Sequence, residues 1–387
     1  MDEKTAALMQ SRIDRLVKTV NYEKADRIPL VAWRSDYMIN YFGLEQRDMN
    51  FENMVDVFVR GNKEFDWDAC DISAPFNPTY GERNKIFRGS MYHMNDDRNA
   101  VQIDPSVIEI LAPEEYDAYI ADPVHFTSEV LLPRRYKVFG PDVSKEEKLA
   151  AFAAFDEINM KQGKFRQEIV DKTGLVGTAH VMVSVPIDYI FDFLRNMSGI
   201  AKDMRRCPDK VIAASDALIT STLNDIKNAP VIPHSAVTSA LHLTPFLKPK
   251  DFEKFYWPYF RDIIVTAHEH GHKCKMLFEK SWKHVFDYLD ELPDNCLIGY
   301  FEKEDGFGNC VKHFAAKKQI VVGGIESELL ARGTKQQVID QVKFNIDNYC
   351  GDGGVMLAPD LPLIYKVDAI PENYKAAMDT VRKYGNY

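Results

Sequence analysis

CKMLFEKSW, residues 274–282, is the stretch from which the fold of this chain can be worked out. Most of its first five residues are apolar, which predicts a short buried strand over 275–278. Glu279 follows that strand directly, and Trp282 opens a predicted helix. A carboxylate therefore stands at the end of an apolar strand, immediately before a helix.

The same alternation of strand and helix continues to the end of the chain. Strands are predicted at 296–299, 319–322 and 355–358, and helices at 251–270, 282–291, 308–316, 334–349 and from 371 onward. Thr334 with Gln337 forms a capping box, and Pro371 is a favoured first-turn residue. Short apolar strands joined by helices predict a parallel sheet covered by helices.

The N-terminal half supplies the remaining predicted strands, which lie at 28–32, 67–72, 175–179 and 230–233. The count comes near eight, which favours a single α/β domain over 1–387, a (β/α)8 TIM barrel with an N-terminal helical extension, over a doubly wound sheet. The sequence has no GxGxxG or GxxxxGK[ST] phosphate loop. Residues 75–165 do not fit the repeat and are predicted to be an insertion that covers the barrel mouth.

Composition restricts the classes of partner. The 387 residues carry a net charge of -10, which argues against nucleic acid and anionic membranes as general partners. No stretch approaches about 18 apolar residues, so no membrane span is predicted. The charged N-terminus is interpreted as a helix and not as a signal peptide. The six cysteines form no CxxC pair, which fits a reducing cytoplasm and argues against a zinc ribbon or a disulfide framework.

Barrel enzymes place their chemistry at the C-terminal ends of the strands. The side chains at or just after the predicted strand ends are Trp33, Arg34, Asp36, His180, His234, Glu279, Tyr300, Glu302, Glu326 and Asp360. Six of them are expected to share one pocket: Arg34, His180, His234, Glu279, Tyr300 and Asp360. Independent strands rarely all end in ionisable groups by chance. His242 is instead interpreted as a structural residue near a loop.

Each of these side chains also has a structural interpretation. Glu279 could cap the following helix, and His180 and His234 could be hydrogen-bonded core histidines. Glu302 could belong to a solvated loop, and Asp360 could form a turn with the preceding proline. The sequence does not decide between these interpretations and a pocket role.

Five stretches resemble the uroporphyrinogen decarboxylase superfamily, which also contains the cobalamin- and coenzyme M-type methyltransferases of anaerobes. They are ADRIPL (25–30), TPFLKPKDFEKFYWPYFRDII (244–264), GGIESELLARGTKQQV (323–338), GDGGVMLAPD (351–360) and IPENYKAAMDTV (370–381). The resemblance covers most of residues 20–387. It implies a single barrel with its active site at the mouth of the strands.

The resemblance also implies roles for particular residues. Decarboxylases of the superfamily carry an arginine-rich RQAGR-type loop after the first strand, whereas this chain reads AWRSDYM, with Arg34 as the counterpart that is left. A tetrapyrrole with eight carboxylates needs several cations, so uroporphyrinogen is disfavoured as the substrate. The methyltransferase branch binds zinc through H-x-C and a later Cys. Here Leu277 and Glu279 take the first two places, and the later Cys falls at or beside Asp360–Leu361.

Two kinds of site follow from these replacements. His234, Glu279 and Asp360 could form a zinc site without thiolates. Alternatively, the site is free of metal and Glu279 acts as an acid or base.

The leading hypothesis is a corrinoid-dependent methyltransferase component. It would move a methyl group between a small O-, N- or S-methyl compound and a separate corrinoid protein, because the chain has no DxHxxG cobalamin motif of its own. Expected catalytic residues are Glu279, His234 and Tyr300, and expected substrate-binding residues are Trp33, Arg34 and His180.

Aromatic residues of the insertion are expected to wall an apolar substrate pocket: Phe76, Tyr80, Phe87, Tyr92, Tyr136 and Phe139. The alternatives are a decarboxylase or lyase of a tetrapyrrole or small carboxylic acid, and a non-catalytic binding barrel. The methyl donor, the acceptor and the direction of transfer stay open. A homodimer is among the oligomeric states left open.

Overall fold

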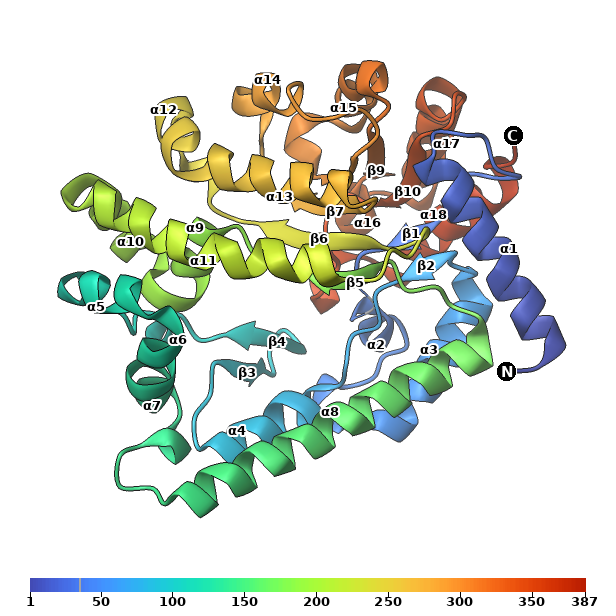
Figure 1. Ribbon diagram of the computed structural model, residues 1–387. Helices are drawn as coiled ribbons and strands as arrows, with labels where there is room; N and C mark the ends of the chain where they lie inside the picture. The colour runs from blue at the N-terminus through green and yellow to red at the C-terminus, as the bar shows by residue number, and fades with distance from the viewer. Residues whose placement is uncertain (35) are drawn as a thin grey trace.

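A six-stranded parallel sheet forms the centre of the molecule, with the order β10-β9-β8-β7-β6-β5 (Figure 1). The computed structural model describes residues 1–34 and 36–387. The strands are β5 (Ala179–Met182), β6 (Ala236–Leu241), β7 (Lys273–Phe278), β8 (Leu297–Phe301), β9 (Ile320–Ile325) and β10 (Val355–Pro359). The chain is therefore a mixed α/β protein built on a parallel sheet, as the sequence pattern predicts.

Two short strands complete the parallel set. β1 (Val31–Ala32) pairs with β2 (Ala69–Cys70) in a separate two-stranded sheet. Isolated parallel bridges join Leu30 to Leu357 beside β10, and Ala69 to Val176 just before β5. Continuous pairing thus covers six strands, and single bridges link the other two to both ends of that sheet.

Strand β7 explains the opening stretch of sequence. Cys274, Met276 and Phe278 are fully buried in the large cluster that joins the sheet to its covering helices. Leu277 belongs instead to a second cluster, which lies on the opposite face of the strands. Successive side chains of a strand point to opposite faces, so Glu279 shares the inner face with Leu277.

Helices cover the outer face of the sheet, with α11 and α13 beside β5–β7 and the C-terminal helices beside β9 and β10 (Figure 1). From the middle of the chain onward they are α9 (Pro186–Ile190), α10 (Asn196–Arg206), α11 (Pro208–Asn228), α12 (Pro249–Asp251), α13 (Trp257–Glu269), α14 (Phe286–Leu289), α15 (Phe307–Phe314), α16 (Ser327–Arg332), α17 (Lys335–Tyr349) and α18 (Pro371–Tyr384). The predicted capping box of Thr334 and Gln337 is present at α17, and Pro371 begins α18.

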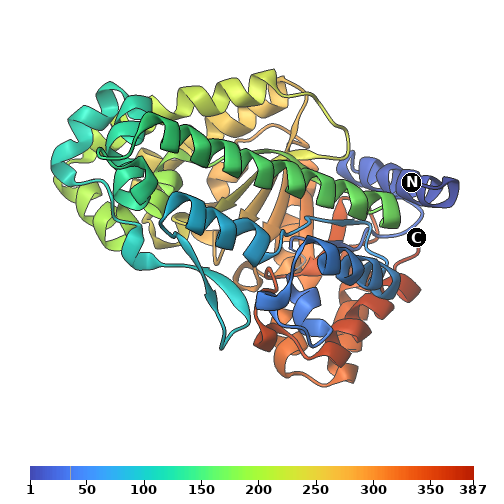
Figure 2. The same cartoon turned by 90° about the horizontal axis from the view of Figure 1, so that it is seen from below.

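The N-terminal part adds a further set of helices: α1 (Glu3–Val20), α2 (Tyr37–Tyr41), α3 (Phe51–Phe65), α4 (Glu82–Phe87), α5 (Tyr116–Ala121), α6 (Pro123–Phe126), α7 (Leu132–Arg135) and α8 (Lys145–Thr173). β3 (Tyr92–Asn95) and β4 (Ala100–Ile103) form an antiparallel hairpin. The long α8 packs along α3 and α4 and passes in front of the strands when the molecule is seen from below (Figure 2). Most of segment 75–165 is therefore built from short elements around α8.

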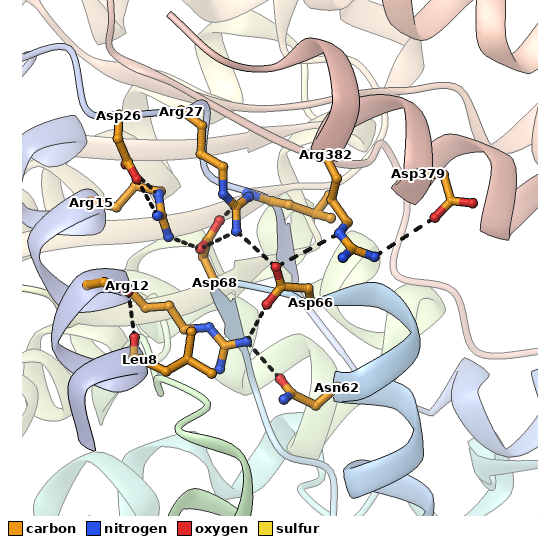
Figure 3. Close-up of polar contacts among 12 residues, drawn as sticks. Leu8, Arg12, Arg15, Asp26, Arg27, Asn62, Asp66, Asp68, Asp379 and Arg382 are labelled. Atoms are coloured by element: carbon orange, nitrogen blue, oxygen red, sulfur yellow. Dashed lines mark hydrogen bonds and ion pairs between the residues drawn. The ribbon is translucent and has the colours of Figure 1, made fainter. Parts of the chain in front are cut away.

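Arginines and aspartates are interlocked at the N-terminal ends of β1 and β2 (Figure 3). Asp68 is fully buried and accepts hydrogen bonds from Arg15, Arg27 and the backbone N–H of Leu30. Nη2 of Arg12 lies 2.8 Å from Oδ1 of Asp66. We call this set of five ionic residues the basal network. It ties α1 and the end of α3 to the starts of the first two strands.

Two predicted elements are wrong in their bounds. The helical crossover at 187–226 is broken by a π-helical turn at Phe191–Arg195 and again between α10 and α11. The strand predicted at 230–233 lies instead at Ala236–Leu241, and residues 233–234 form a turn before it. This shift of the strand changes which histidine stands at its C-terminal end.

Among the described residues, no helix is long and apolar enough to cross a membrane. All six cysteines are free thiols, and five of them are buried. The absence of disulfides agrees with the spacing of cysteines in the sequence.

Candidate functional site

The C-terminal ends of the parallel strands form one edge of the molecule, which we call the mouth. The first or second residue after each of six strands carries a polar or aromatic side chain: Trp33 after β1, Asp71 after β2, His242 after β6, Glu279 after β7, Glu302 after β8 and Asp360 after β10. Parallel strands bring their C-terminal ends to the same edge, so these side chains gather there.

Glu279 is part of a chain of three ionisable groups at the mouth. Its Oε1 lies 3.3 Å from Nε2 of His242, and Nδ1 of the same ring lies 2.7 Å from Oδ2 of Asp192. Burial alone would lower the pKa of His242, but the hydrogen bonds to Asp192 and Glu279 outweigh it and raise the pKa to about 11. At neutral pH His242 is therefore a cation that donates one N–H to each carboxylate.

Two further carboxyl groups beside this chain hold their protons unusually strongly. Burial, together with the nearby charge of Glu279, raises the pKa of Glu302 to about 7, although its Oε2 accepts a hydrogen bond from the backbone N–H of Lys280. Burial likewise raises the pKa of Asp188 to about 7, against the opposing effects of His242 and the Tyr256 hydroxyl. Carboxyl groups whose pKa lies near neutrality are suited to acid–base chemistry.

A cavity of about 1340 Å³ opens between the mouth and the segment 75–165. Strand-end residues such as Trp33, Asp71 and Met182 form one wall. Tyr80, Tyr92 and residues of α8 form the opposite wall. Residues of segment 75–165 thus face the strand ends across the cavity, whereas Glu279, Glu302, Tyr300 and Asp360 are not among the residues that line it.

Arg34 lines the cavity but already has a partner. Its Nε and Nη2 donate to the two carboxylate oxygens of Asp36, at 2.7 and 3.1 Å. Burial would raise the pKa of Asp36, yet the charge of Arg34 keeps that pKa below its ordinary value. The positive charge of Arg34 is therefore largely neutralised within the protein.

A buried lysine contacts two residues that line the cavity, Asp71 and Trp33. Nζ of Lys275 lies 2.6 Å from Oδ2 of Asp71 and 2.7 Å from Oγ1 of Thr178. It also lies 4.7 Å from the centre of the Trp33 ring, which packs edge-on against Tyr300. Tyr300 is thus within β8 and buried, whereas the sequence placed it just beyond the strand.

The structure does not bring His234 to Glu279. His234 lies in the turn before β6, whose first residue, Ala236, pairs with Lys273 at the start of β7. Glu279 follows the other end of β7, so a rise of about 3.3 Å per residue separates the two side chains by roughly 20 Å or more. His234 therefore lies on the side opposite the mouth, and the predicted grouping of these two residues is wrong.

His180 lies near the same N-terminal edge. Its Nδ1 contacts Oγ of Ser235 at 3.1 Å, and its Nε2 contacts Nδ1 of His272 at 3.2 Å. Both partners precede their strands, β6 and β7. The cavity is lined by Ala179 and Met182 of the same strand but not by His180. The expectation that His180 stands at a strand end in the pocket is therefore wrong.

Comparison with known proteins agrees with this architecture. A family model for uroporphyrinogen decarboxylase (URO-D) matches residues 169–384. The chain belongs to the uroporphyrinogen decarboxylase family. Among solved structures, a methyltransferase from Methanosarcina mazei superimposes with a TM-score of 0.61 over 96% of this chain and 98% of that chain, at 13% sequence identity. At that identity the likeness shows a shared fold. No curated protein matches the sequence.

A zinc site of the kind expected from the URO-D family resemblance does not fit the residues present. Asp360 accepts a hydrogen bond from the backbone N–H of Ser327 at 2.9 Å, at the start of α16, and His234 lies far from Glu279. Within residues 1–34 and 36–387, no group of three or more His, Cys, Asp or Glu side chains is arranged to hold a metal ion. The chemistry proposed for this site therefore involves no zinc ion.

Several residues of the site were missed from the sequence. His242 was interpreted as structural because β6 was placed six residues too early. Asp71 and Lys275 were not singled out, although a lysine inside an apolar strand is an unusual residue that needs a buried partner. No sequence pattern pointed to Asp192 as a site residue, because only the turn Phe191–Arg195 brings it to His242.

The predicted aromatic wall divides into two groups. Tyr80 and Tyr92 line the cavity. Phe87, Tyr136 and Phe139 form a separate small core with Val138 and Ala151, and Phe76 packs near Tyr80 with a ring-centre distance of 6.3 Å. Half of the proposed wall thus stabilises the inserted segment itself.

Proposed function

We propose that this member of the URO-D family is the methyl-transferring component of a corrinoid-dependent system. It would bind a small O-, N- or S-methyl compound in the cavity and exchange its methyl group with a corrinoid carried by a separate protein. The observation that carries this proposal is the pair Glu302 and Glu279 at the mouth, where one carboxyl has a pKa of about 7 and the other contacts a cationic histidine.

Removal of a methyl group from oxygen, nitrogen or sulfur is assisted by a proton donor beside the leaving atom. The bond to the methyl carbon breaks, both of its electrons stay on the heteroatom, and that atom must then take up a proton. The partner's corrinoid supplies the nucleophile that accepts the methyl group. A carboxylic acid with a pKa near the working pH is an effective proton donor, and we assign this role to Glu302.

Glu279 would act with His242 and Asp192. The imidazolium between the two carboxylates fixes the position of Glu279 by hydrogen bonding. A charged Glu279 beside Glu302 in turn keeps the proton on Glu302 until the leaving atom needs it. After the transfer, Glu302 would regain a proton from solvent through the partly exposed Glu279.

The dimensions of the site suit two reactants. The cavity of about 1340 Å³ exceeds the range of about 300–1,000 Å³ typical of sites for one small molecule. Two large apolar side chains are exposed near the mouth, Met182 at 71% and Phe246 at 55%. These features support access for a partner's bulky cofactor, whereas a self-contained enzyme would need neither.

A decarboxylase or lyase acting on a carboxylic acid is the second candidate, because cationic side chains line the cavity. It would release carbon dioxide without any partner. A non-catalytic binding barrel would do neither reaction. We also propose that the eight parallel strands close into a single (β/α)8 barrel, which the two isolated bridges support; a crystal structure with β1 detached from β10 would contradict it.

The purified protein should be incubated with reduced cobalamin and a panel of methyl ethers, methylamines and methyl thioethers. Corrinoid absorbance would report methyl transfer, and headspace analysis would report carbon dioxide. We expect transfer with one substrate class, faster when a corrinoid protein captured from the source cell replaces free cobalamin. Carbon dioxide release without transfer would favour the lyase.

A further inference from the structure

We propose that Arg83 is the binding group for a carboxylate in this cavity, and that the methylated substrate is an aromatic acid. Only the statement that the substrate carries a methyl group rests on the proposed function. Arg83 belongs to α4, in the segment 75–165 and outside the residues 169–384 that match the URO-D family model. The family match therefore assigns no role to Arg83.

Arg83 has hydrogen-bonding capacity that the protein does not use. It lines the cavity, and its Nε and Nη2 are buried and have no hydrogen-bond partner among the described residues. A buried donor without a partner costs about 1–3 kcal/mol, and more when it is charged. Such a donor is retained where a bound ligand accepts its hydrogen bonds. Two adjacent guanidinium N–H groups match the two oxygens of one carboxylate.

Two neighbouring tyrosine rings pack against Arg83 and fix its orientation. Its guanidinium carbon lies 5.1 Å from the ring centre of Tyr80 and 5.2 Å from that of Tyr92. The two rings themselves are 4.7 Å apart. A guanidinium stacked on aromatic faces can still donate from its edge, so Arg83 is held in place before a ligand arrives.

The charge of the cavity is opposite in sign to that of the whole protein. The chain carries a net charge of -10, but the cavity is lined by Arg34, Arg83 and Arg166. The two aspartates that also line it are paired, Asp36 with Arg34 and Asp71 with Lys275. An uncompensated positive charge in an acidic protein selects and steers an anion.

The aromatic lining indicates the body of that anion. Trp33, Tyr80, Tyr92, Phe155 and Tyr365 all line the cavity, and they come from five separate parts of the chain. Flat apolar rings pack well against such faces, in stacked or edge-on geometry. A benzoate-like molecule would therefore bind with its ring among these side chains and its carboxylate at Arg83.

Arg34 is the obvious rival, because it was expected to anchor an anion. Its Nε and Nη2 are already occupied by both carboxylate oxygens of Asp36. A second carboxylate at Arg34 would lie beside the charge of Asp36 and be repelled by it. Arg83 has no such competitor among the described side chains that line the cavity.

The test compares the binding of two probes by calorimetry, 4-methoxybenzoate and its uncharged counterpart 4-methoxybenzamide, without any corrinoid. We expect the wild type to bind the acid about 10- to 100-fold more tightly than the amide, as a hydrogen-bonded ion pair implies. Arg83→Gln should reduce this preference to within about twofold, and Arg83→Lys should keep part of it.

Arg98→Gln is the matched control. Arg98 also lies 5.2 Å from a tyrosine ring, that of Tyr365, but it does not line the cavity. It should keep the full preference. The double variant Arg34→Gln/Asp36→Asn removes the paired charges together and should also keep the preference.

Equal binding of acid and amide to the wild type, or binding of neither at about 10 mM, would overturn the proposal. So would a preference that survives in Arg83→Gln, or one that is lost in the double variant alone. Methyl transfer is measured separately on the same samples with reduced cobalamin. Acid preference without transfer would refute the proposed function and leave the Arg83 site standing.

Discussion

Arginines near the two ends of the parallel strands differ in whether they are paired with carboxylates. At the N-terminal end, Arg12, Arg15 and Arg27 of the basal network each contact at least one aspartate, as Figure 3 shows. A few single nitrogens there lack a partner, such as Nε of Arg12, but no guanidinium of the network lacks a carboxylate. Across the cavity from the mouth, Arg83 packs against two adjacent tyrosine rings, and its buried donors are unused.

The difference separates stability from function within one architecture. Buried charges that are paired inside the protein hold elements together and have no capacity left for a ligand. Buried charges without a partner lower stability and are retained where binding compensates for them. In proteins of this architecture, the N-terminal ends of strands serve stability and the C-terminal ends carry chemistry.

The largest expected effect is on the stability of the basal network. Asp68→Asn removes a fully buried charge that faces Arg15 and Arg27. Breaking a buried ion pair from one side costs about 3–5 kcal/mol, which should appear in urea unfolding. Asp26→Asn is the control, since Asp26 contacts the same Arg15 but is 66% exposed, and it should cost about 1 kcal/mol or less. Equal effects of the two variants would contradict the distinction.

The next effect concerns the mouth. Glu279→Gln keeps an oxygen that can accept from Nε2 of His242 but removes the charge. Methyl transfer should fall by about 10²–10⁴-fold, while the melting temperature stays within a few degrees. Glu326→Gln alters the equivalent exposed carboxylate after β9 and should have little effect. Near-normal transfer by Glu279→Gln would leave this residue a purely structural role.

The sequence was sufficient to predict a mixed α/β protein with a parallel sheet, and the place of Glu279 at a strand end. Apolar strand runs such as the one before Glu279, followed by helices with caps at Thr334 and Pro371, are local signals that the structure confirms. Each depends on neighbouring residues and on the two-residue period of a strand. The alternation therefore also indicated that a carboxylate stood at a strand end.

The error at β6 has a physical cause. The run Val231-Ile232-Pro233 is more apolar than the true strand, Ala236–Leu241, which has Thr238 and Ser239 at its centre. Prolines cannot donate to a sheet ladder, and the predicted strand 230–233 begins and ends with one. Giving that constraint more weight than hydrophobicity would have placed His242, and not His234, at the mouth.

Contacts distant in sequence could not have been predicted. Asp71 and Lys275 are separated by about 200 residues and meet only because their strands face one another across the inner cluster. The sequence singled out Arg34 as a candidate anion anchor and gave no signal for Arg83. Asp36 pairs with Arg34, whereas Arg83 contacts two tyrosine rings and, among the described residues, no carboxylate. This difference, which favours Arg83 as the anion-binding residue, is visible only in three dimensions.

A smaller effect is expected in the pH dependence of stability. Burial raises the pKa of Glu302 from 4.5 to about 7, so the folded state binds this proton more tightly than the unfolded state. Its stabilising contribution is complete below pH 4.5 and is lost as the pH rises through 7, by about 3 kcal/mol in all. Glu302→Gln should remove this loss and be more stable than the wild type at pH 8.

Chemical unfolding between pH 4 and 9 would measure this dependence. Glu304→Gln, at an exposed neighbouring position, should keep most of it. A Glu302→Gln profile that parallels the wild type would show that Glu302 is charged in the folded protein at neutral pH and would remove it as the proton donor.

The smallest effect returns to the N-terminal edge and has the opposite sign. Burial, and then the neighbouring His272 and His234, lower the pKa of His180. The unfolded chain therefore binds this proton more readily, so the contribution of His180 is complete above pH 6.5 and declines as the pH falls below it. His180→Gln should weaken this acid-side decline and cost about 1 kcal/mol for the lost contact with His272. Turnover should not change, because His180 faces away from the mouth; a large loss of methyl transfer at unchanged stability would instead return His180 to the substrate site.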